Sequence, residues 1–286
     1  MAGAAGSGKT FVGVHLILEK LRANPDANML FAAQTHGLVL FVAKWLAQRA
    51  ACTVERDSIL TRVHFMYALA EGKQIEGPFE IELDTVAKEG RLKLVPATTK
   101  PEYALVVVDE AHHVTVVPGN KQIIQEHAAT GKTELLYLSD LSQCGKAGQC
   151  DLPDPDVKLT QVVRSTQRIV AAAMQFQATE DAELTRSYCD QPGPPLKPFF
   201  FKAKCACIAP DTCNVCIKDF ASNTVLALED QVEMVPTLNL HDRVAILVPD
   251  EDFRDTLLAE IRQNVADSEK LLKQFDLSLY GRLSFP

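Results

Sequence analysis

The chain has 286 residues, of which 47% are hydrophobic and 23% charged, an ordinary composition for one large or two small globular domains. Its formal net charge of −8 argues against a broad basic surface for nucleic acid, although a local groove could still be positive. The sequence contains no apolar run of about 18 residues and no secretory signal pattern, so we expect neither a membrane span nor a signal peptide.

The first ten residues contain a phosphate-binding motif. Gly3 to Thr10 reads G-x-x-x-x-G-K-T, the Walker A pattern of P-loop NTPases. Its glycines let backbone N–H groups wrap a polyphosphate, Lys9 brings a charge to the β- and γ-phosphates, and Thr10 offers a hydroxyl to Mg²⁺. The nucleotide-binding residues predicted here are Gly3, Gly6, Ser7, Gly8, Lys9 and Thr10.

A helix is expected directly after this motif, because apolar residues recur at helical spacing from Phe11 to Leu21. A P-loop normally leaves the carboxyl end of a buried strand. Only Met1 and Ala2 precede the motif, so we expect that strand to be missing. Either the sequence is a fragment of a longer protein, which we favour, or another segment fills the gap.

The first half of the chain alternates predicted strands with predicted helices. We expect strands at 28–33, 103–109 and 135–138, a helix at 38–51, strand or helix at 63–70, and a polar connector at 72–90. The run Tyr103 to Asp109 is continuously apolar and β-branched, which suits a parallel strand covered on both faces. The pattern predicts an α/β fold with a doubly wound parallel sheet, with a first domain at 1–145.

The second half is predicted as a separate domain at 157–286. Residues 144–156 are rich in Gly, Pro and Asp, which indicates a domain boundary. Beyond them we expect helices at 159–177, 225–235 and 253–272 and strands at 199–202 and 243–248.

Two carboxylates follow the strand that ends at residue 109. Asp109 is placed to hold Mg²⁺ through water, and Glu110 to orient or deprotonate the water that attacks the γ-phosphate. His112 could couple the nucleotide to a neighbouring motif, or it could be a solvated residue at a helix start. For His113 we favour the solvated residue.

The order of these motifs resembles the superfamily 1 helicases, and within them the Schlafen-type helicase-like ATPase domains. Gly3 to Thr10 corresponds to motif I, and 33–36 resembles motif Ia. Val106 to His112 (VVVDEAH) resembles motif II, 138–143 motif III and 159–165 motif IV. The resemblance implies a RecA-like ATPase domain followed by a partial second RecA-like domain.

The resemblance also implies roles for three further residues. Gln143 would sense the γ-phosphate, Arg164 would reach across the cleft to stabilise charge on it, and Thr35 would contact the backbone of a single nucleic-acid strand. Each has an ordinary alternative. Gln143 could be a polar turn residue, Arg164 a solvated helix residue, and Thr35 the cap of the next helix.

The chain departs from the helicase pattern in several places, the first of which is the missing strand before motif I. Ser139 stands where motif III usually has glycine, and we find no motif V and no motif VI with its arginine. These departures put movement along a strand in more doubt than ATP binding.

A cysteine cluster lies in the second predicted domain. Four thiolates can close a tetrahedral zinc site, but the spacing is tighter than in most zinc ribbons, so structural Zn²⁺ and ordinary reduced thiols both stay open. The four residues are Cys205, Cys207, Cys213 and Cys216.

The leading hypothesis is therefore an ATPase that uses Mg²⁺ and couples hydrolysis to single-stranded RNA or DNA. Lys9, Glu110, Gln143 and Arg164 are the predicted catalytic residues, and Thr10 and Asp109 the predicted Mg²⁺ ligands. The alternatives are a nucleotide-gated switch that binds a protein partner, or an incomplete gene product. The eight cysteines do not form the evenly spaced framework of a secreted protein, and a nucleotide motif implies a reducing compartment, the cytoplasm or nucleus.

Overall fold

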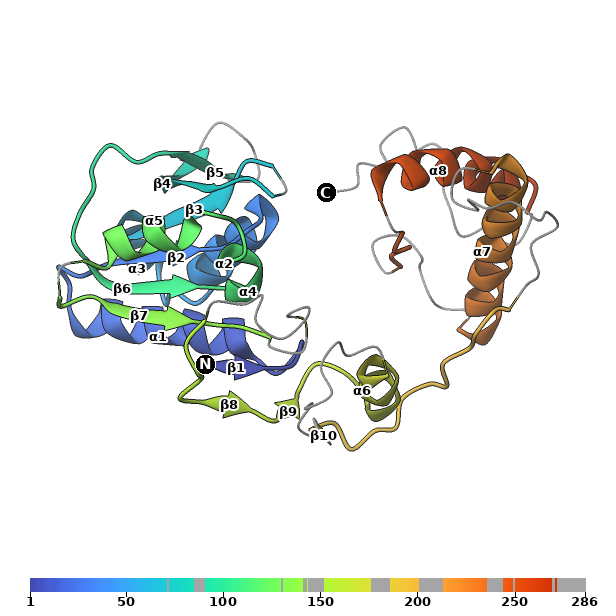
Figure 1. Cartoon of the computed structure of the whole chain (residues 1–286), viewed down its shortest axis with the longest axis horizontal. Helices are drawn as coiled ribbons and strands as arrows, with labels where there is room; N and C mark the ends of the chain where they lie inside the picture. Colours follow the sequence, from blue (N-terminus) through green and yellow to red (C-terminus); the bar gives the residue numbers. More distant parts are fainter. Residues whose placement is uncertain are drawn as a thin grey trace. The chain divides into compact units, whose positions relative to one another are not determined.

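The computed structural model contains two compact units, Met1–Leu196 and Lys197–Pro286 (Figure 1). It describes residues 1–70, 72–84, 91–129, 131–140, 143, 152–175, 186–200, 213–235, 244–248, 250–268 and 271. The division between the units comes later in the chain than the boundary predicted at 144–156. Residues 152–175 and 186–196 belong to the first unit.

The first unit alternates strands and helices along most of its length. Its strands are β1 (Ala2–Gly3), β2 (Asn28–Ala32), β3 (Val63–Ala68), β4 (Ile75–Asp84), β5 (Arg91–Pro96), β6 (Tyr103–Val108), β7 (Glu134–Tyr137), β8 (Lys158–Leu159), β9 (Gln161–Val162) and β10 (Arg186–Ser187). Its helices are α1 (Lys9–Ala23), α2 (His36–Gln48), α3 (Thr53–Arg62), α4 (Ala111–Val114), α5 (Asn120–His127) and α6 (Gln167–Met174).

The central sheet has six strands in the order β5-β4-β3-β2-β6-β7. Strands β3, β2, β6 and β7 are parallel, whereas β4 and β5 add an antiparallel edge. Phe31 in β2 lies opposite Phe65 in β3 and Val107 in β6. The predicted fold class, a doubly wound parallel sheet in an α/β domain, is confirmed for this unit.

Hydrophobic residues on both faces of the sheet explain this three-layer arrangement. Along β6, Leu105 and Val107 face the layer of α1, α2 and α3, while Val106 and Val108 face the layer of α4 and α5. All four side chains are at most 1% exposed. A strand covered on both faces needs the continuous apolar run that the sequence shows there.

Strand β1 stands at the start of the phosphate-binding loop. It has two residues, Ala2–Gly3, and Gly3 is already the first residue of the motif, so the expectation that the buried strand before the motif is missing stays a prediction. Its Ala2 pairs in parallel with Lys158 of β8 and forms a bridge to Ser139, and the Met1 amino group donates to Tyr137 O at 2.9 Å. Backbone pairing on both sides holds this strand, and a strand of two residues is too short to show a hydrophobic pattern.

Several other elements differ from the sequence prediction. The segment expected to be a polar connector contains β4, and the predicted helix at 159–177 is helical in its described part only over Gln167–Met174, after β8 and β9. The residues at 199–200 and 244–248 are not strands, and 201–202 and 243 lie outside the described residues. Apolar and acidic residues alternate along the second half of β4, as in a strand with one face on the core and the other toward solvent. This alternation predicts a strand, which the expectation of a polar connector missed.

The second unit is built on two helices, α7 (Asn214–Met234) and α8 (Glu251–Ala266). They share a small hydrophobic core that includes Ile217, Ala221, Phe253 and Leu257. No strand occurs among the residues described here, and a second RecA-like domain at 157–286 stays a prediction. Across the described residues of both units, no helix combines the length and apolar composition that crossing a bilayer requires.

Glycine allows α1 to lie close to the sheet. A Cβ added to Gly13 would lie 2.9 Å from Leu138 Cδ1 and 3.3 Å from Val107 Cγ1, whereas one added to Gly37 in α2 would meet nothing within 4 Å. We therefore expect Gly13→Leu to lower the free energy of unfolding by about 1–3 kcal/mol through overpacking. Gly37→Leu is the matched control and should be no less stable than wild type. Urea unfolding checks both, and equal stability of the two variants would contradict this account of the helix–sheet contact.

Candidate functional site

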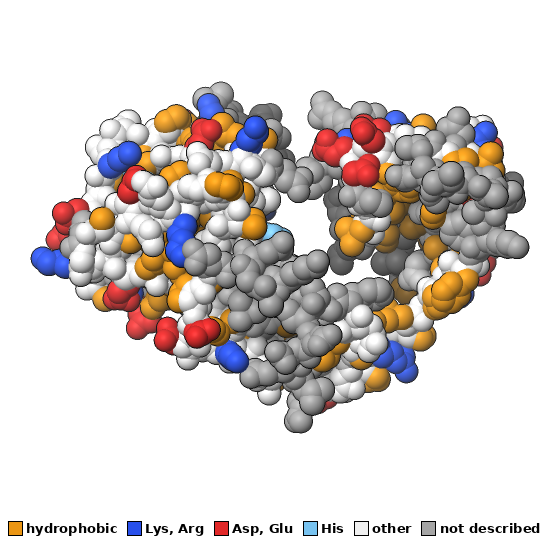
Figure 2. All heavy atoms as spheres, in the orientation of Figure 1, with side chains coloured by type: hydrophobic (Ala, Val, Ile, Leu, Met, Phe, Trp, Pro, Cys, Tyr) orange, Lys and Arg blue, Asp and Glu red, His pale blue; other side chains and the backbone are white. Residues whose placement is uncertain are grey.

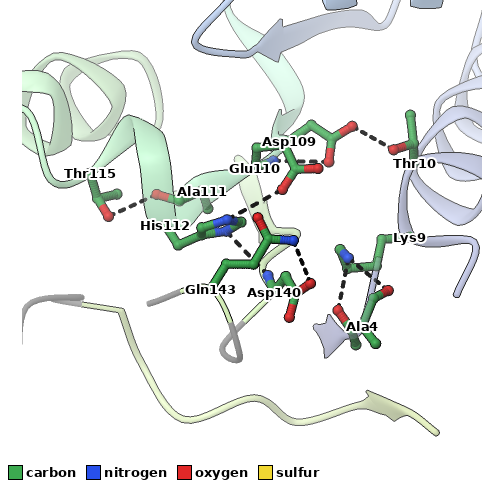
Figure 3. A network of polar contacts seen from close by, with 11 residues as sticks. Ala4, Lys9, Thr10, Asp109, Glu110, Ala111, His112, Thr115, Asp140 and Gln143 are labelled. Carbon is green, nitrogen blue, oxygen red and sulfur yellow. Dashed lines mark hydrogen bonds and ion pairs between the residues drawn. The ribbon is translucent and has the colours of Figure 1, made fainter. Parts of the chain in front are cut away.

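Three loops meet at one edge of the sheet. The glycine-rich loop follows β1, Asp109 and Glu110 follow β6, and Ser139 and Asp140 follow β7. These strands run parallel, so their carboxyl ends point the same way, and in open α/β sheets that edge is where ligands bind. Figure 3 shows the side chains from the three loops directed toward one another.

The glycine-rich loop has the backbone shape of an anion cradle. Gly6 (φ 79°) and Gly8 (φ 95°) are in the left-handed region, where a side chain would be strained. Gly8 is the N-cap of α1, so the N–H groups of Lys9, Thr10 and Phe11 have no acceptor within the helix. Free amides at a helix N-terminus favour a bound anion, and the buried Ser7 Oγ beside them has no hydrogen-bond partner among the described residues.

The Lys9 ammonium lies against the loop that precedes it. Its Nζ donates to Gly3 O at 2.8 Å and to Ala4 O at 3.2 Å, and the residue is only 6% exposed (Figure 3). The charge acts on the neighbouring groups, because it lowers the pKa of both Asp109 and His112 as one of several contributions. A cation is therefore held at the mouth of the cradle.

A short hydrogen bond joins the cradle to the end of β6. Thr10 Oγ1 donates to Asp109 Oδ2 at 2.7 Å, and Glu110 N donates to Asp109 Oδ1 at 2.9 Å. Asp109 is fully buried, and this burial raises the pKa of its carboxyl. A hydroxyl and a carboxylate at this distance fit Mg²⁺, which takes one or two protein oxygens and leaves its other positions to phosphate and water.

Glu110 has a strained backbone. It lies at φ 48° and ψ 45°, and no other non-glycine residue in the described ranges has a positive φ. Such a conformation costs on the order of 1–3 kcal/mol and is typical of functional sites. Its Oε2 is buried, has no hydrogen-bond partner in the part of the chain that the structure describes, and lies 3.5 Å from His112 Nε2. In this conformation the Glu110 carboxylate is close enough to Asp109 to raise its pKa, as one of several contributions.

His112 connects the loop after β6 with the loop after β7. Its Nδ1 accepts a hydrogen bond from Asp140 N at 3.2 Å, so in the neutral ring the proton is on Nε2, which faces Glu110. Burial, and secondly the nearby His113, lower the pKa of His112 to about 4, so the ring is neutral near pH 7. His113 is exposed. Of the two interpretations of His112, the buried link between motifs fits this geometry.

Asp140 is the residue that sequence reasoning missed. It is 2% exposed, and its Oδ2 accepts a hydrogen bond from Gln143 Nε2 at 2.7 Å. Hydrogen bonds connect Gln143 through Asp140 to His112, whose Nε2 lies 3.5 Å from Glu110 Oε2 (Figure 3). The available signal was an acidic residue directly after a parallel strand, the same pattern that pointed to Asp109.

Arg164 and Thr35 lie in different surroundings. Val163 N and Arg164 N both donate to Gly6 O, at 3.0 and 3.3 Å, so the segment after β9 packs on the glycine-rich loop within the first unit. The Arg164 side chain is exposed. Thr35 is the N-cap of α2, and its Oγ1 accepts from Leu38 N at 3.3 Å. The structure thus brings Arg164 to the loop and gives Thr35 a capping role.

Two of the four cysteines of the zinc prediction lie outside the described residues. Cys205 and Cys207 are not described, Cys213 is the N-cap of α7, and Cys216 is buried in that helix. Within the described ranges, no three His, Cys, Asp or Glu side chains are grouped to hold a metal ion. The four-cysteine zinc site stays a prediction.

Comparisons with known proteins point to one family. Residues 1–144 match the family model described as Schlafen group 3, DNA/RNA helicase domain. No curated protein matches the chain. Among solved structures, the large terminase ATPase domain of a Thermus phage is similar at 13% identity and a TM-score of 0.30, over 49% of this chain and 58% of that one. A mutant of that domain has the same identity and TM-score over 52% and 61%. This chain therefore spans less than two thirds of either.

The neutral His112 ring leads to a prediction on pH. Its pKa is lower in the folded protein than in the unfolded chain, so its contribution to stability is present above about pH 6.5 and is lost as the pH falls toward 4. As the pH falls from 6.5 to 4, the free energy of unfolding should decrease less steeply in His112→Asn than in wild type. The two slopes should differ by at most about 1.4 kcal/mol per pH unit, the effect of one proton. Chemical denaturation at several pH values measures the slope.

His36→Asn is the matched control for this experiment, because that ring is exposed at the start of α2 and is not among the groups that shift the pKa of His112. It should keep close to the wild-type slope. His64 and His127, whose pKa values burial also lowers, remain in every variant and so do not affect the comparison. An unchanged slope in His112→Asn would show that the folded protein accommodates a charged His112.

Proposed function

Because the chain belongs to the Schlafen group 3 DNA/RNA helicase domain family, we propose that its P-loop domain binds ATP with Mg²⁺ and hydrolyses it. The observation that carries this proposal is the 2.7 Å hydrogen bond between Thr10 and Asp109. It joins the phosphate cradle to the acidic end of β6. A site for a nucleoside triphosphate needs both parts, one for the phosphates and one for the metal ion.

Binding rests on the cradle and its charges. The amides of α1 and the Lys9 ammonium would hold the phosphates, and Thr10 and Asp109 would hold Mg²⁺. The metal would neutralise phosphate charge as the bond to the leaving group breaks. When phosphate oxygens are present, Lys9 Nζ can exchange Gly3 O and Ala4 O for them.

Hydrolysis needs a base, and Glu110 is the group that the arrangement offers. Its carboxylate would take a proton from water, the water oxygen would attack the γ-phosphorus, and the phosphorus–oxygen bond to ADP would break. His112 Nε2 lies 3.5 Å from Glu110 Oε2 without a hydrogen bond, and a small approach would let it donate to that carboxylate. The ring would not compete for the proton, since its low pKa keeps it neutral. His112 is thus a positioning residue.

Two further residues respond to the phosphates in this proposal. Gln143 would report the state of the γ-phosphate, since it is connected through Asp140 and His112 to Glu110. Arg164 would stabilise charge on the transferring group, and its backbone contact with Gly6 O holds it next to the loop.

Coupling to single-stranded RNA or DNA is the second part of the proposal, and the family supports it. Any contact surface has to be local, because the chain carries a net charge of −8. On the face shown in Figure 2, described acidic and basic side chains of the first unit are intermixed, and no broad basic patch covers it.

Two substitutions separate binding from turnover. Lys9→Ala should abolish ATP binding, because it removes the cation at the cradle. Glu110→Gln should retain binding and lower the hydrolysis rate by at least about 100-fold, because it removes the base. Calorimetry with MgATP and a phosphate-release assay measure the two effects.

The controls are residues of the same type outside the site. Lys20→Ala changes a lysine further along α1, and Glu126→Gln a carboxylate on α5. Both variants should bind and hydrolyse ATP as wild type does. Normal hydrolysis by Glu110→Gln would remove Glu110 from the role of base.

Nucleic-acid coupling has its own test. Single-stranded RNA or DNA should raise the rate of ATP hydrolysis, and the stimulation should fall as salt rises, because phosphate contacts release counterions. Steady-state hydrolysis with an oligonucleotide at two salt concentrations measures this. ATP turnover that no oligonucleotide changes would contradict the coupling and favour a nucleotide-gated switch for a protein partner.

A further inference from the structure

A row of aromatic side chains lies on α1 and α2 beside the phosphate cradle. We call Phe11, His15, Trp45 and Phe41 the aromatic row. The ring of Phe11 lies 4.2 Å from that of His15 and 5.7 Å from that of Trp45, and Trp45 lies 5.6 Å from Phe41, all between centroids. Phe11 is 44% exposed, although the inward positions Val14 and Leu18 of the same helix are at most 2% exposed. The core therefore does not require an aromatic residue at position 11.

Phe11 occupies a particular place in the cradle. It directly follows Thr10, and its amide is the third free N–H at the start of α1. Asp109 and Glu110 mark the reacting end of a bound triphosphate, near Thr10. The other end, which carries the sugar and base, has to leave the first turn of α1, where the Phe11 ring is exposed to solvent.

We propose that Phe11, flanked by His15 and Trp45, is the surface on which the base of the bound nucleotide stacks. The proposal names a subsite of the nucleotide site and rests on the proposed function. Contacts with two neighbouring rings limit the freedom of the Phe11 side chain, so little rotamer entropy is lost when a base covers it. Because every base has a π-face, stacking here strengthens binding without selecting adenine over guanine.

The test compares a nucleotide with a phosphate chain that has no base. The full chain and its Phe11→Ala variant are titrated with MgATP, with MgGTP and with magnesium tripolyphosphate. We expect Phe11→Ala to lower the affinity for ATP and for GTP by about tenfold each, which is in the range of one lost base–aromatic stack. The affinity for tripolyphosphate should be unchanged. Phe11→Trp should retain the affinity for both nucleotides.

The chain supplies its own reporter for this experiment. Trp45 is the single tryptophan, and it lies next to Phe11. ATP should change its fluorescence, and tripolyphosphate should change it much less. Phe41→Ala is the matched control, since Phe41 is an exposed aromatic residue on the far side of Trp45. This variant should bind ATP as wild type does.

The outcomes separate the subsite from the function itself. Wild-type protein that binds neither ATP nor tripolyphosphate overturns both proposals. If Phe11→Ala loses affinity for ATP and for tripolyphosphate equally, or loses affinity for neither, the stacking subsite alone is overturned. The proposed function would stand, since the cradle still binds phosphate in wild type. A loss of oligonucleotide binding with unchanged ATP binding would assign the aromatic row to nucleic acid and also overturn the subsite.

Discussion

The hydrogen bond between Thr10 and Asp109 is the constraint on which the site depends. It connects residues 99 positions apart, one at the start of α1 and the other at the end of β6. Its two residues meet because α1 packs closely on the sheet whose strand β6 ends at Val108. Gly13 allows that close packing, because any side chain there would meet Leu138 and Val107. The order of the strands and the contact of α1 with the sheet together place Thr10 Oγ1 at 2.7 Å from Asp109 Oδ2.

A chain of polar contacts extends from this point across the edge of the sheet. Glu110 is held in a left-handed conformation next to His112, His112 accepts the Asp140 amide, and Asp140 accepts the Gln143 side chain. Burial is the main cause of the low pKa of His112, about 4, so the imidazole is neutral near pH 7 and its Nδ1 can accept the Asp140 amide. Hydrogen bonds therefore join the loop after β6 to the loop after β7, and Glu110 lies 3.5 Å from the His112 end of this chain.

The phosphate cradle is completed by segments that are distant in the sequence. Strand β1 is held on one side by the residues after β7 and on the other by β8. The carbonyl of Gly6 accepts hydrogen bonds from the two residues after β9. A two-residue strand could not hold the loop alone, so these backbone bonds position it. They also bring Arg164 to the loop within the first unit, whereas the resemblance to helicases implied an approach from across a cleft.

The sequence alone determined the parts of this protein that depend on local chemistry. The spacing of Gly6, Gly8, Lys9 and Thr10 and the β-branched run that ends at Asp109 predicted the cradle, the buried strand and the parallel sheet, because each is encoded by neighbouring residues. Tertiary structure decided the rest: the pairing of β1, the antiparallel edge of β4 and β5, the roles of His112 and Asp140, and the contact of Arg164 with the loop. These depend on hydrogen bonds between residues far apart in the chain, and no local pattern in a single sequence records which distant groups will meet.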